Sequence, residues 1–191
     1  MAETIAVLSQ KGGTGKTTAV RTLTDIFRRA LRDVQRGYDI VLVDCPPALG
    51  LLTVNALVAA DHALLSAEAQ YFALQGVEQA IEVIDLARES LNPDLAWLGV
   101  VLNIADMRTI HSREAYDTLT EHFGDRVFDT TIRASIAYAE SAERAVSILD
   151  HRPDLSADYL ALADEALGRL GMGDARERVA MLHATSTDGA R

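Results

Sequence analysis

Short apolar runs alternate along the chain with segments whose apolar positions repeat with a helical period. The runs, each of strand length, lie at residues 5–8, 38–44, 62–66, 98–103 and 127–133. Helical periodicity marks residues 17–36, 76–91, 112–123, 139–147 and 155–170. Strands and helices that alternate in this way predict an α/β fold, with a mostly parallel sheet and helices on both of its faces.

The ends of these elements carry residues with known local preferences. Gly37 ends the first helix, Asn92-Pro93 stops the second, and Ser112 is the expected N-cap of the third. We predict one domain over residues 1–171. A partly disordered tail over residues 172–191 should follow, because its last residues are small or polar.

Charge excludes one broad class of function. The chain has 191 residues and a formal net charge of −10, which argues against a generally basic nucleic-acid binder. Arginines gather in the first predicted helix, at Arg21, Arg28, Arg29, Arg32 and Arg36. They form either a solvated basic face or a functional patch, and any contact with DNA requires a local patch of this kind.

The apolar runs are too short to span a bilayer, and the amino terminus has no signal-like character, so we predict a cytoplasmic protein. The single cysteine, Cys45, cannot form an internal disulfide, which fits a reducing compartment. Because Cys45 follows a predicted buried strand, it is either an inert core thiol or a reactive one.

A glycine-rich segment, S-Q-K-G-G-T-G-K-T-T at residues 9–18, joins the first apolar run to the first helix. A strand, a glycine-rich turn and a helix are together typical of a phosphate cradle, in which backbone N–H groups and the helix dipole bind phosphate oxygens. Lys16 would reach the β- and γ-phosphates, and the Thr17 hydroxyl would bind Mg²⁺. The alternative is a glycine-rich turn without a ligand. At Gln10 the segment departs from the general P-loop pattern, which has glycine there.

The second apolar run ends in an acid, Asp44. A carboxylate at the end of a hydrophobic strand is the Walker B arrangement, in which it holds Mg²⁺ directly or through a water. The pattern is weak on its own, but the glycine-rich segment gives it a specific meaning. Together they predict a site for nucleotide phosphates and Mg²⁺.

The K-G-G-T-G-K-T-T sequence, with its early lysine, resembles the deviant Walker A box of the ParA/MinD partition ATPases, a SIMIBI-like group of P-loop NTPases. Residues 44–50, D-C-P-P-A-L-G, resemble the D-C-P-P-x-L-G switch segment of ParA-type proteins. Residues 68–76 resemble their E-Y-x-A-L-E-G stretch, with Gln70 and Gln75 where acids are usual. The resemblance extends over residues 4–170.

This resemblance implies ATP and Mg²⁺ as cofactors, and Lys11, Lys16 and Asp44 as catalytic residues. Lys11 would contact the nucleotide of the partner subunit, while Lys16 and Asp44 would contact the nucleotide bound by their own subunit. The implied nucleotide-binding residues are Lys11, Gly12, Gly13, Thr14, Gly15, Lys16, Thr17 and Thr18. Thr17 and Asp44 are the implied Mg²⁺ ligands. Asn103, at the end of the fourth apolar run, is either a reader of the adenine edge or a turn asparagine.

One block of the family pattern is missing. In ParA-type proteins the P-loop helix is followed by a strand ending in D-x-D-P-Q-G-N and by several tens of residues before the Walker B strand. Here only residues 21–39 separate the two motifs. The resemblance implies that the Walker A and Walker B strands are neighbours, so a shortened P-loop NTPase without the strands beyond Walker B can still close. Residues 38–44 would become an exposed apolar edge, along which we predict aggregation or dimer pairing.

The missing segment carries the aspartate with which the family positions the attacking water, so weak hydrolysis is implied. Asp106 is either a substitute or a loop-surface acid. Residues 132–141, I-R-A-S-I-A-Y-A-E-S, stand where ParA proteins often have I-P-R-N-x-R-x-x-E-A. The proline and both usual arginines are replaced, while Arg133 and Glu140 are present, which leaves DNA binding by this loop open.

Three functions are compatible with these patterns. The first is a ParA-like partitioning ATPase that dimerises around two ATP·Mg²⁺, associates nonspecifically with DNA, responds to a ParB-like adaptor and lies in the cytoplasm or on the nucleoid. The second is a nucleotide-binding dimerisation or regulatory module that does not hydrolyse ATP. The third is a MinD-like membrane-associated ATPase. Because residues 175–183 carry too little apolar bulk for stable anchoring, we expect no membrane partner.

Overall fold

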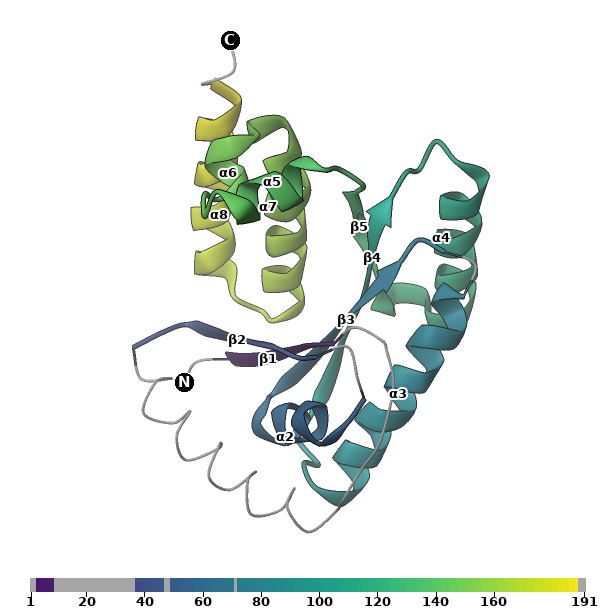
Figure 1. Ribbon diagram of the computed structural model, residues 1–191. Coiled ribbons are helices and arrows are strands. Elements are labelled where there is room, and N and C mark those ends of the chain that lie inside the picture. Colours follow the sequence, from purple (N-terminus) through teal and green to yellow (C-terminus); the bar gives the residue numbers. More distant parts are fainter. Residues whose placement is uncertain (1–2, 9–36, 47–48, 71, 189–191) are drawn as a thin grey trace. The chain divides into compact units, whose positions relative to one another are not determined.

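The computed structural model describes residues 3–8, 37–46, 49–70 and 72–188, which form a five-stranded sheet and its helices (Figure 1). The strand order is β2-β1-β3-β4-β5. The strands are β1 (Glu3–Leu8), β2 (Ile40–Asp44), β3 (His62–Glu68), β4 (Ala96–Ala105) and β5 (Val127–Arg133). The helices are α2 (Leu51–Ala59), α3 (Ala73–Ser90), α4 (Ile110–Phe123), the 3-10 helix η1 (Gly124–Arg126), α5 (Ala137–Glu143), α6 (Ile148–His151), α7 (Pro153–Arg169) and α8 (Gly173–Asp188). The helix predicted over residues 17–36 lies outside the described residues.

The chain divides into two compact units, where the sequence pattern predicts one domain over residues 1–171. The first unit comprises Met1–Ala67 and Phe72–Val100. The second comprises Glu68–Tyr71 and Val101–Arg191. The boundary falls inside β4, so this strand contributes its first half to one unit and its second half to the other.

In the first unit, β1 lies between β2 and β3 and runs parallel to both. The register with β2 runs from Glu3 opposite Ile40 to Val7 opposite Asp44. Residues 4–6 of β1 are buried on both faces of the strand, as is typical of a central strand in a parallel sheet. The prediction that the strands carrying the two motifs are neighbours is confirmed.

Helix α3 buries the apolar stripe that its periodicity predicts. Val77, Ala80, Ile84 and Ala87 are all buried, and the helix begins at Ala73, three residues before the predicted start. Positions three and four apart lie on one helix face, which is why this stripe could be read from the sequence.

A buried amide fixes the loop after α3 to the end of α2. Asn92 is 1% exposed, and its Nδ2 donates to the carbonyl oxygens of Leu57 at 3.0 Å and Ala60 at 2.8 Å. The last carbonyls of a helix have no partner within the helix, so these bonds satisfy acceptors that would otherwise be buried unpaired.

In the second unit, α7 packs along β5 and contacts α6 and α8. The core of this unit includes Leu102, Leu119, Phe128 and Ile132, each at most 2% exposed. Strand β5 has the bounds that its sequence pattern predicts.

Two helices form where the sequence pattern predicts none. Helix α2 consists mainly of apolar residues and has buried positions on several sides, so it lacks the one-sided periodicity that marks an amphipathic helix. Helix α8 occupies most of the predicted tail. It packs against α7, where the Arg176 guanidinium donates to both carboxylate oxygens of Asp164 at 2.9 and 2.7 Å.

Two predicted helix ends are also corrected. Thr109, not Ser112, is the N-cap of α4, because the Thr109 side chain accepts the Ser112 N–H at 3.3 Å. The hydroxyl of Ser112 accepts instead from the Asp106 N–H, at 3.1 Å. Helix α5 ends at Glu143, short of the predicted end at residue 147, because Ala145 turns into the left-handed region with φ of 51°.

Within the described residues, no helix combines the length and the apolar character that crossing a bilayer requires.

Candidate functional site

The predicted site residues divide into two groups. Asp44 and Asn103 belong to the described part of the chain, Asp44 in the first unit and Asn103 in the second. The predicted nucleotide-binding residues Lys11, Gly12, Gly13, Thr14, Gly15, Lys16, Thr17 and Thr18 lie outside the described residues. The geometry that follows therefore concerns the strands from which the site would be built.

The carboxyl ends of β1 and β2 lie side by side. Val7 pairs with Asp44 in the parallel register, and residues 9–18 follow β1 directly in the sequence. Ligands of parallel α/β sheets bind at the carboxyl ends of the strands. The register thus brings the Asp44 carboxylate to the strand end from which the glycine-rich segment continues.

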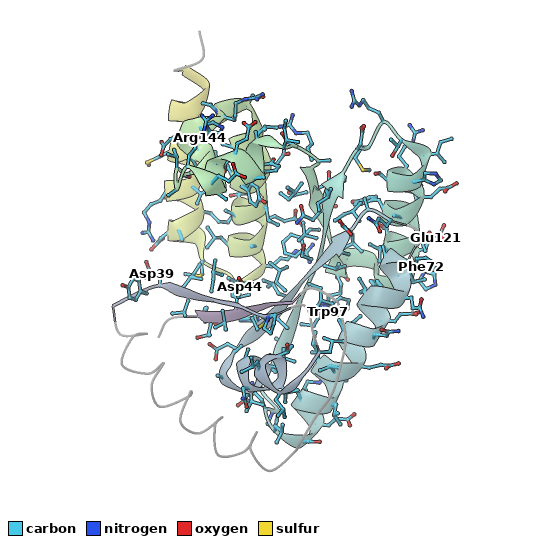
Figure 2. The ribbon with its side chains drawn as sticks, in the orientation of Figure 1. Asp39, Asp44, Phe72, Trp97, Glu121 and Arg144 are labelled. Atoms are coloured by element: carbon cyan, nitrogen blue, oxygen red, sulfur yellow. The ribbon has the colours of Figure 1, made fainter. Side chains whose placement is uncertain are left out.

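Asp44 is suited to bind a cation. Its side chain is exposed at the end of β2, and Figure 2 labels it and Asp39 at opposite ends of the strand region. Among the described residues no ion pair engages it. A carboxylate oxygen is the ligand type that Mg²⁺ prefers, and Mg²⁺ needs only one or two carboxylates when phosphates complete its shell. Asp44 therefore fits the role of an Mg²⁺ ligand at a phosphate site.

Cys45, next to Asp44, is an inert thiol. It is 7% exposed, and its Sγ lies 3.6 Å from the Val43 carbonyl oxygen. Burial, with the neighbouring Asp44 charge as a second cause, raises the pKa of the Cys45 thiol from 9.0 to about 11. The burial of Cys45 confirms the core-thiol interpretation, and the raised pKa keeps the reactive thiolate scarce at neutral pH.

Asn103 lies near the carboxyl end of β4 and is half-buried. Its Oδ1 accepts the N–H of Ile104 at 2.8 Å, and its backbone oxygen accepts the N–H of Ala69 at 3.1 Å. Ile104 has φ of 53°, an uncommon backbone conformation for a β-branched residue. The side chain of Asn103 thus bonds the backbone of the next residue, within β4. A contact with adenine stays a prediction.

The loop after β4 holds Asp106 in an ion pair. Arg108 donates to the Asp106 carboxylate from Nε at 2.8 Å, from a terminal guanidinium nitrogen at 2.9 Å and from its backbone N–H at 3.1 Å. These bonds lower the pKa of Asp106 to about 2. Its carboxylate is thus engaged within its own loop, which favours the loop-surface interpretation over a water-positioning role.

Arg133 is joined to helix α7. Its Nε donates to Asp158 at 2.8 Å, its guanidinium donates to the Asp154 carbonyl oxygen at 2.6 Å, and its backbone N–H donates to Asp158 at 3.1 Å. A guanidinium paired with a carboxylate in this way stabilises the fold, and less of its positive charge is available to bind phosphate. The sequence pattern gave no sign of this, because Asp158 belongs to a helix that packs on β5 only in the folded chain.

No group of three or more His, Cys, Asp or Glu side chains in the described ranges is arranged to hold a metal ion. In the first unit, Asp44 is the carboxylate that lies at the end of the strand beside β1.

Comparison with known proteins assigns the sequence to a group. A family model described as an AAA domain (AAA_31) matches residues 21–97. The chromosome-partitioning ATPase Soj of Thermus thermophilus is 36% identical over 158 residues, which cover 82% of this chain and 63% of that protein. The chromosome partitioning protein ParA of Myxococcus xanthus is 36% identical over 156 residues, which cover 81% of this chain and 55% of that protein. This chain thus spans little more than half the length of these relatives.

Solved structures support the fold. The septum site-determining protein MinD of Pyrococcus horikoshii, complexed with Mg-ADP, matches with a TM-score of 0.64 and 18% identity, over 86% of this chain and 96% of that chain. Cobyrinic acid a,c-diamide synthase of Mycobacterium smegmatis, with bound ADP and magnesium, matches with a TM-score of 0.54 and 30% identity, over 71% of this chain and 56% of that chain. The predicted α/β fold with a mostly parallel sheet is confirmed.

Proposed function

We propose that this chain, which belongs to the ParA/Soj/MinD family of P-loop ATPases, binds ATP·Mg²⁺ where β1 and β2 end and acts in plasmid or chromosome partitioning with weak hydrolysis. The observation that carries this proposal is the parallel register of Val7 with Asp44. It brings the strand that precedes the glycine-rich segment beside the strand that ends in the acid. A glycine-rich turn without a ligand would not require that neighbour.

Each site residue has a role in this proposal. Backbone N–H groups of residues 12–16 would cradle the phosphates, and Lys16 would neutralise the β- and γ-phosphates. Thr17 and Asp44 would hold Mg²⁺, whose charge stabilises the phosphates during transfer. Lys11 would reach the nucleotide of a second subunit in an ATP-dependent homodimer. Asn103 remains the candidate base-contacting residue.

The short connection between the two motifs supports weak turnover. Phosphoryl transfer depends on positioning and charge stabilisation, so a site without its water-positioning group should bind nucleotide and hydrolyse it slowly. Asp106, the candidate substitute for the water-positioning aspartate, is paired with Arg108. The lack of a water-positioning group favours one alternative, a nucleotide-dependent dimerisation module that does not hydrolyse ATP.

DNA association would depend on a limited set of arginines. The second unit pairs many of its arginines with acids, namely Arg108 with Asp106, Arg133 with Asp158, Arg152 with Asp154, Arg169 with Glu165 and Arg176 with Asp164. These pairs leave less positive charge for phosphates. The arginine-rich residues 21–36, which lie outside the described residues, are then the strongest candidates in the sequence. We further propose that the chain has a ParB-like adaptor as its partner, lies in the cytoplasm or on the nucleoid, and has no membrane partner.

Calorimetry with ATP and Mg²⁺ tests the site. Asp44→Asn should weaken Mg²⁺-dependent binding roughly tenfold to hundredfold, because the carboxylate ligates or orients the ion. Asp39→Asn, the same change at the other end of the same strand region, is the matched control and should leave binding unchanged. Equal affinities for the wild type and Asp44→Asn would contradict the Mg²⁺ role of Asp44.

Amine labelling gives a direct readout of the glycine-rich segment's chemistry. Lys11 and Lys16 are the only lysines in the chain, so acylation of lysine side chains reports on this segment alone. ATP·Mg²⁺ should protect Lys16 from acylation, while AMP, which lacks the β- and γ-phosphates, should not. Unprotected Lys16 at saturating ATP would overturn the phosphate-cradle proposal.

Steady-state hydrolysis separates the ATPase from the module. With DNA and a ParB-like adaptor present, turnover that Lys11→Ala abolishes would support the ATPase. Tight ATP binding with no turnover under the same conditions would support the module. Retention on DNA that falls steeply with salt would show phosphate contacts, since neutralised phosphates release counterions.

A further inference from the structure

The outward side of β2 is the unpaired edge of the first unit's sheet. Asp39 accepts the Glu3 N–H through its backbone oxygen at 3.0 Å, so odd-numbered residues of this strand region direct their backbone groups to β1. The N–H and C=O groups of Ile40, Leu42 and Asp44 therefore point away from β1. Among the described residues, no strand pairs with this side of β2.

This edge is also apolar. Leu42 is 68% exposed and Tyr38 is 65% exposed, whereas natural edge strands are usually short of such side chains or carry charges that prevent pairing. Tyr38, Ile40 and Leu42 share one face of the strand, because side chains alternate. An added strand would cover Leu42 and satisfy the outward backbone groups together.

We infer that β2 pairs with β2 of a second copy of this chain, antiparallel and centred on Leu42, to join two sheets across a two-fold axis. In this register Leu42 faces Leu42 of the second copy, and Ile40 faces Asp44. Each of these residues exchanges its N–H and C=O with the residue opposite, which is the hydrogen-bonded pair of an antiparallel ladder. The interface is self-complementary, as a two-fold contact must be.

Charge and chain geometry select this register. Asp44 faces an apolar residue, so no aspartate of β2 lies directly opposite another, and like charges at opposed positions would destabilise the pair. A shift that brings Asp44 opposite Asp44 also shortens the overlap. Pro46 follows the strand and has no N–H to donate, so it ends the outward ladder on that side.

The other end of the sheet explains why a dimer, and not a filament, is the expected product. The backbone of β5 is bonded by side chains of α7: Glu165 accepts the N–H groups of Asp129 and Thr130, and Asp158 accepts that of Arg133. The N–H groups that these carboxylates accept are not available to an added strand. With one edge open, association stops at two chains.

The edge dimer should form without nucleotide, which distinguishes it from the ATP-dependent dimer. Light scattering of the full chain without ATP should give a mass that rises with protein concentration from 20.7 kDa toward twice that value. Leu42→Lys, which opposes two charges at the two-fold axis, should stay at the monomer mass. Leu86→Lys is the matched control, because Leu86 is 62% exposed and belongs to α3, which lies apart from β2 (Figure 1).

Disulfide trapping tests the register and does not depend on Leu42→Lys folding well. In a Cys45→Ala background, Leu42→Cys should form an intermolecular disulfide under mild oxidation, because a directly opposed hydrogen-bonded pair has Cα atoms about 5.5 Å apart. Ile40→Cys should not, because its two copies are displaced by four residues along the ladder, about 13 Å.

Three results would overturn the inference. A wild-type chain that stays monomeric at high concentration would show that the edge is covered or inert. Leu42→Lys with the wild-type mass would place the contact elsewhere. Cross-linking of Ile40→Cys as efficient as that of Leu42→Cys, or masses well beyond two chains, would show unspecific edge aggregation.

Discussion

The sheet ends in β2 on one side and in β5 on the other, and these two edge strands differ in the side chains that bond their backbone groups. At β5, Glu165 accepts two backbone N–H groups at 3.0 Å each, and Arg169 donates to the Val127 carbonyl oxygen at 2.8 Å. At β2, the side chain described on the backbone is Cys45, whose Sγ lies 3.6 Å from the Val43 carbonyl oxygen on the side of β1. The two strands also differ in sequence, because β2 (IVLVD) is apolar apart from Asp44, whereas β5 (VFDTTIR) carries two charged residues and two threonines.

The difference shows that side chains of a helix can take the place of a neighbouring strand. Glu165 and Arg169 are four residues apart on α7, so they lie on one helix face and also bond each other at 2.8 Å. Arg169 further stacks 3.8 Å over the Phe128 ring. The chain that follows β5 supplies this cover.

Removing the carboxylate that covers β5 should have the largest effect. Glu165→Ala deletes the charge-assisted bonds from the N–H groups of Asp129 and Thr130. It also removes the carboxylate that accepts from Arg169. We expect the free energy of unfolding to fall by about 2–3 kcal/mol. It should also open a second edge, so that species larger than dimers appear. Urea unfolding and light scattering measure both effects.

Glu82→Ala is the control, because Glu82 is an exposed glutamate of α3. It should change stability by less than about 0.5 kcal/mol. Equal losses for the two variants would mean that Glu165 does not cover β5.

The pH dependence of stability gives a second check on Glu165. Although burial opposes it, the bonds from Thr130, Asp129 and Arg169 lower the pKa of Glu165 below 4.5. Its stabilisation is present above pH 4.5 and is lost as the pH falls through the lowered pKa, so the wild type and Glu165→Gln should converge in acid.

A substitution at the end of α7, the helix that covers β5, should have a smaller effect on stability. Gly171 has φ of 71° and no heavy atom near its missing Cβ, so Gly171→Ala tests backbone conformation alone. Its N–H donates to the Gly168 oxygen, and the next N–H, of Met172, donates to the Leu167 oxygen, which is a Schellman motif. We expect a loss of about 1 kcal/mol in urea unfolding.

Helix α5 provides the reverse experiment. It ends in the same bond pattern, with the Ala145 N–H donating to the Ala142 oxygen and the Val146 N–H to the Ser141 oxygen, but alanine occupies the left-handed position. Ala145→Gly should therefore stabilise the protein by about 0.5–1 kcal/mol. Effects of the same sign for Ala145→Gly and Gly171→Ala would rule out the conformational explanation.

Arg133, at the end of β5, separates a role in covering this edge from a role in binding DNA. Its side chain is 49% exposed, so the pair with Asp158 is partly screened, and we expect Arg133→Gln to cost about 0.5 kcal/mol. Arg113→Gln makes the same charge change at an exposed arginine of α4. The two variants should reduce DNA retention alike, and only Arg133→Gln should reduce stability. A loss of retention specific to Arg133→Gln would assign it to DNA.

The smallest effect concerns the thiol at the end of the open edge. The rate of Cys45 alkylation should rise with pH to a midpoint of about 11 in the folded protein, against 9.0 when unfolded. Because the Asp44 charge contributes to this shift, Asp44→Asn should lower the midpoint, and ATP·Mg²⁺ should do the same in the wild type. A midpoint near 9.0 in the folded protein would show that the thiol is not buried.

The strands and the candidate site were predictable because their signals are local. The apolar run of residues 127–133 gives β5 directly, and an acid at the end of an apolar run marks Asp44. An exposed edge at β2 was also predicted, from the short connection between the two motifs, and Leu42 of this strand is exposed. Helix α2 was not predictable in this way, since burial on several sides removes its periodicity.

By itself, the sequence determined the order of strands and helices, the phosphate-site motif and the family to which the chain belongs, because each depends on residues close together in the chain. Only the tertiary structure decided that Arg133 joins Asp158, that Thr109 caps α4 and that α7 covers β5. Those contacts form between side chains and backbone groups that meet only when the helices pack. Hydrophobic periodicity encodes which face of a helix is buried, but not which polar groups at its margin find a partner.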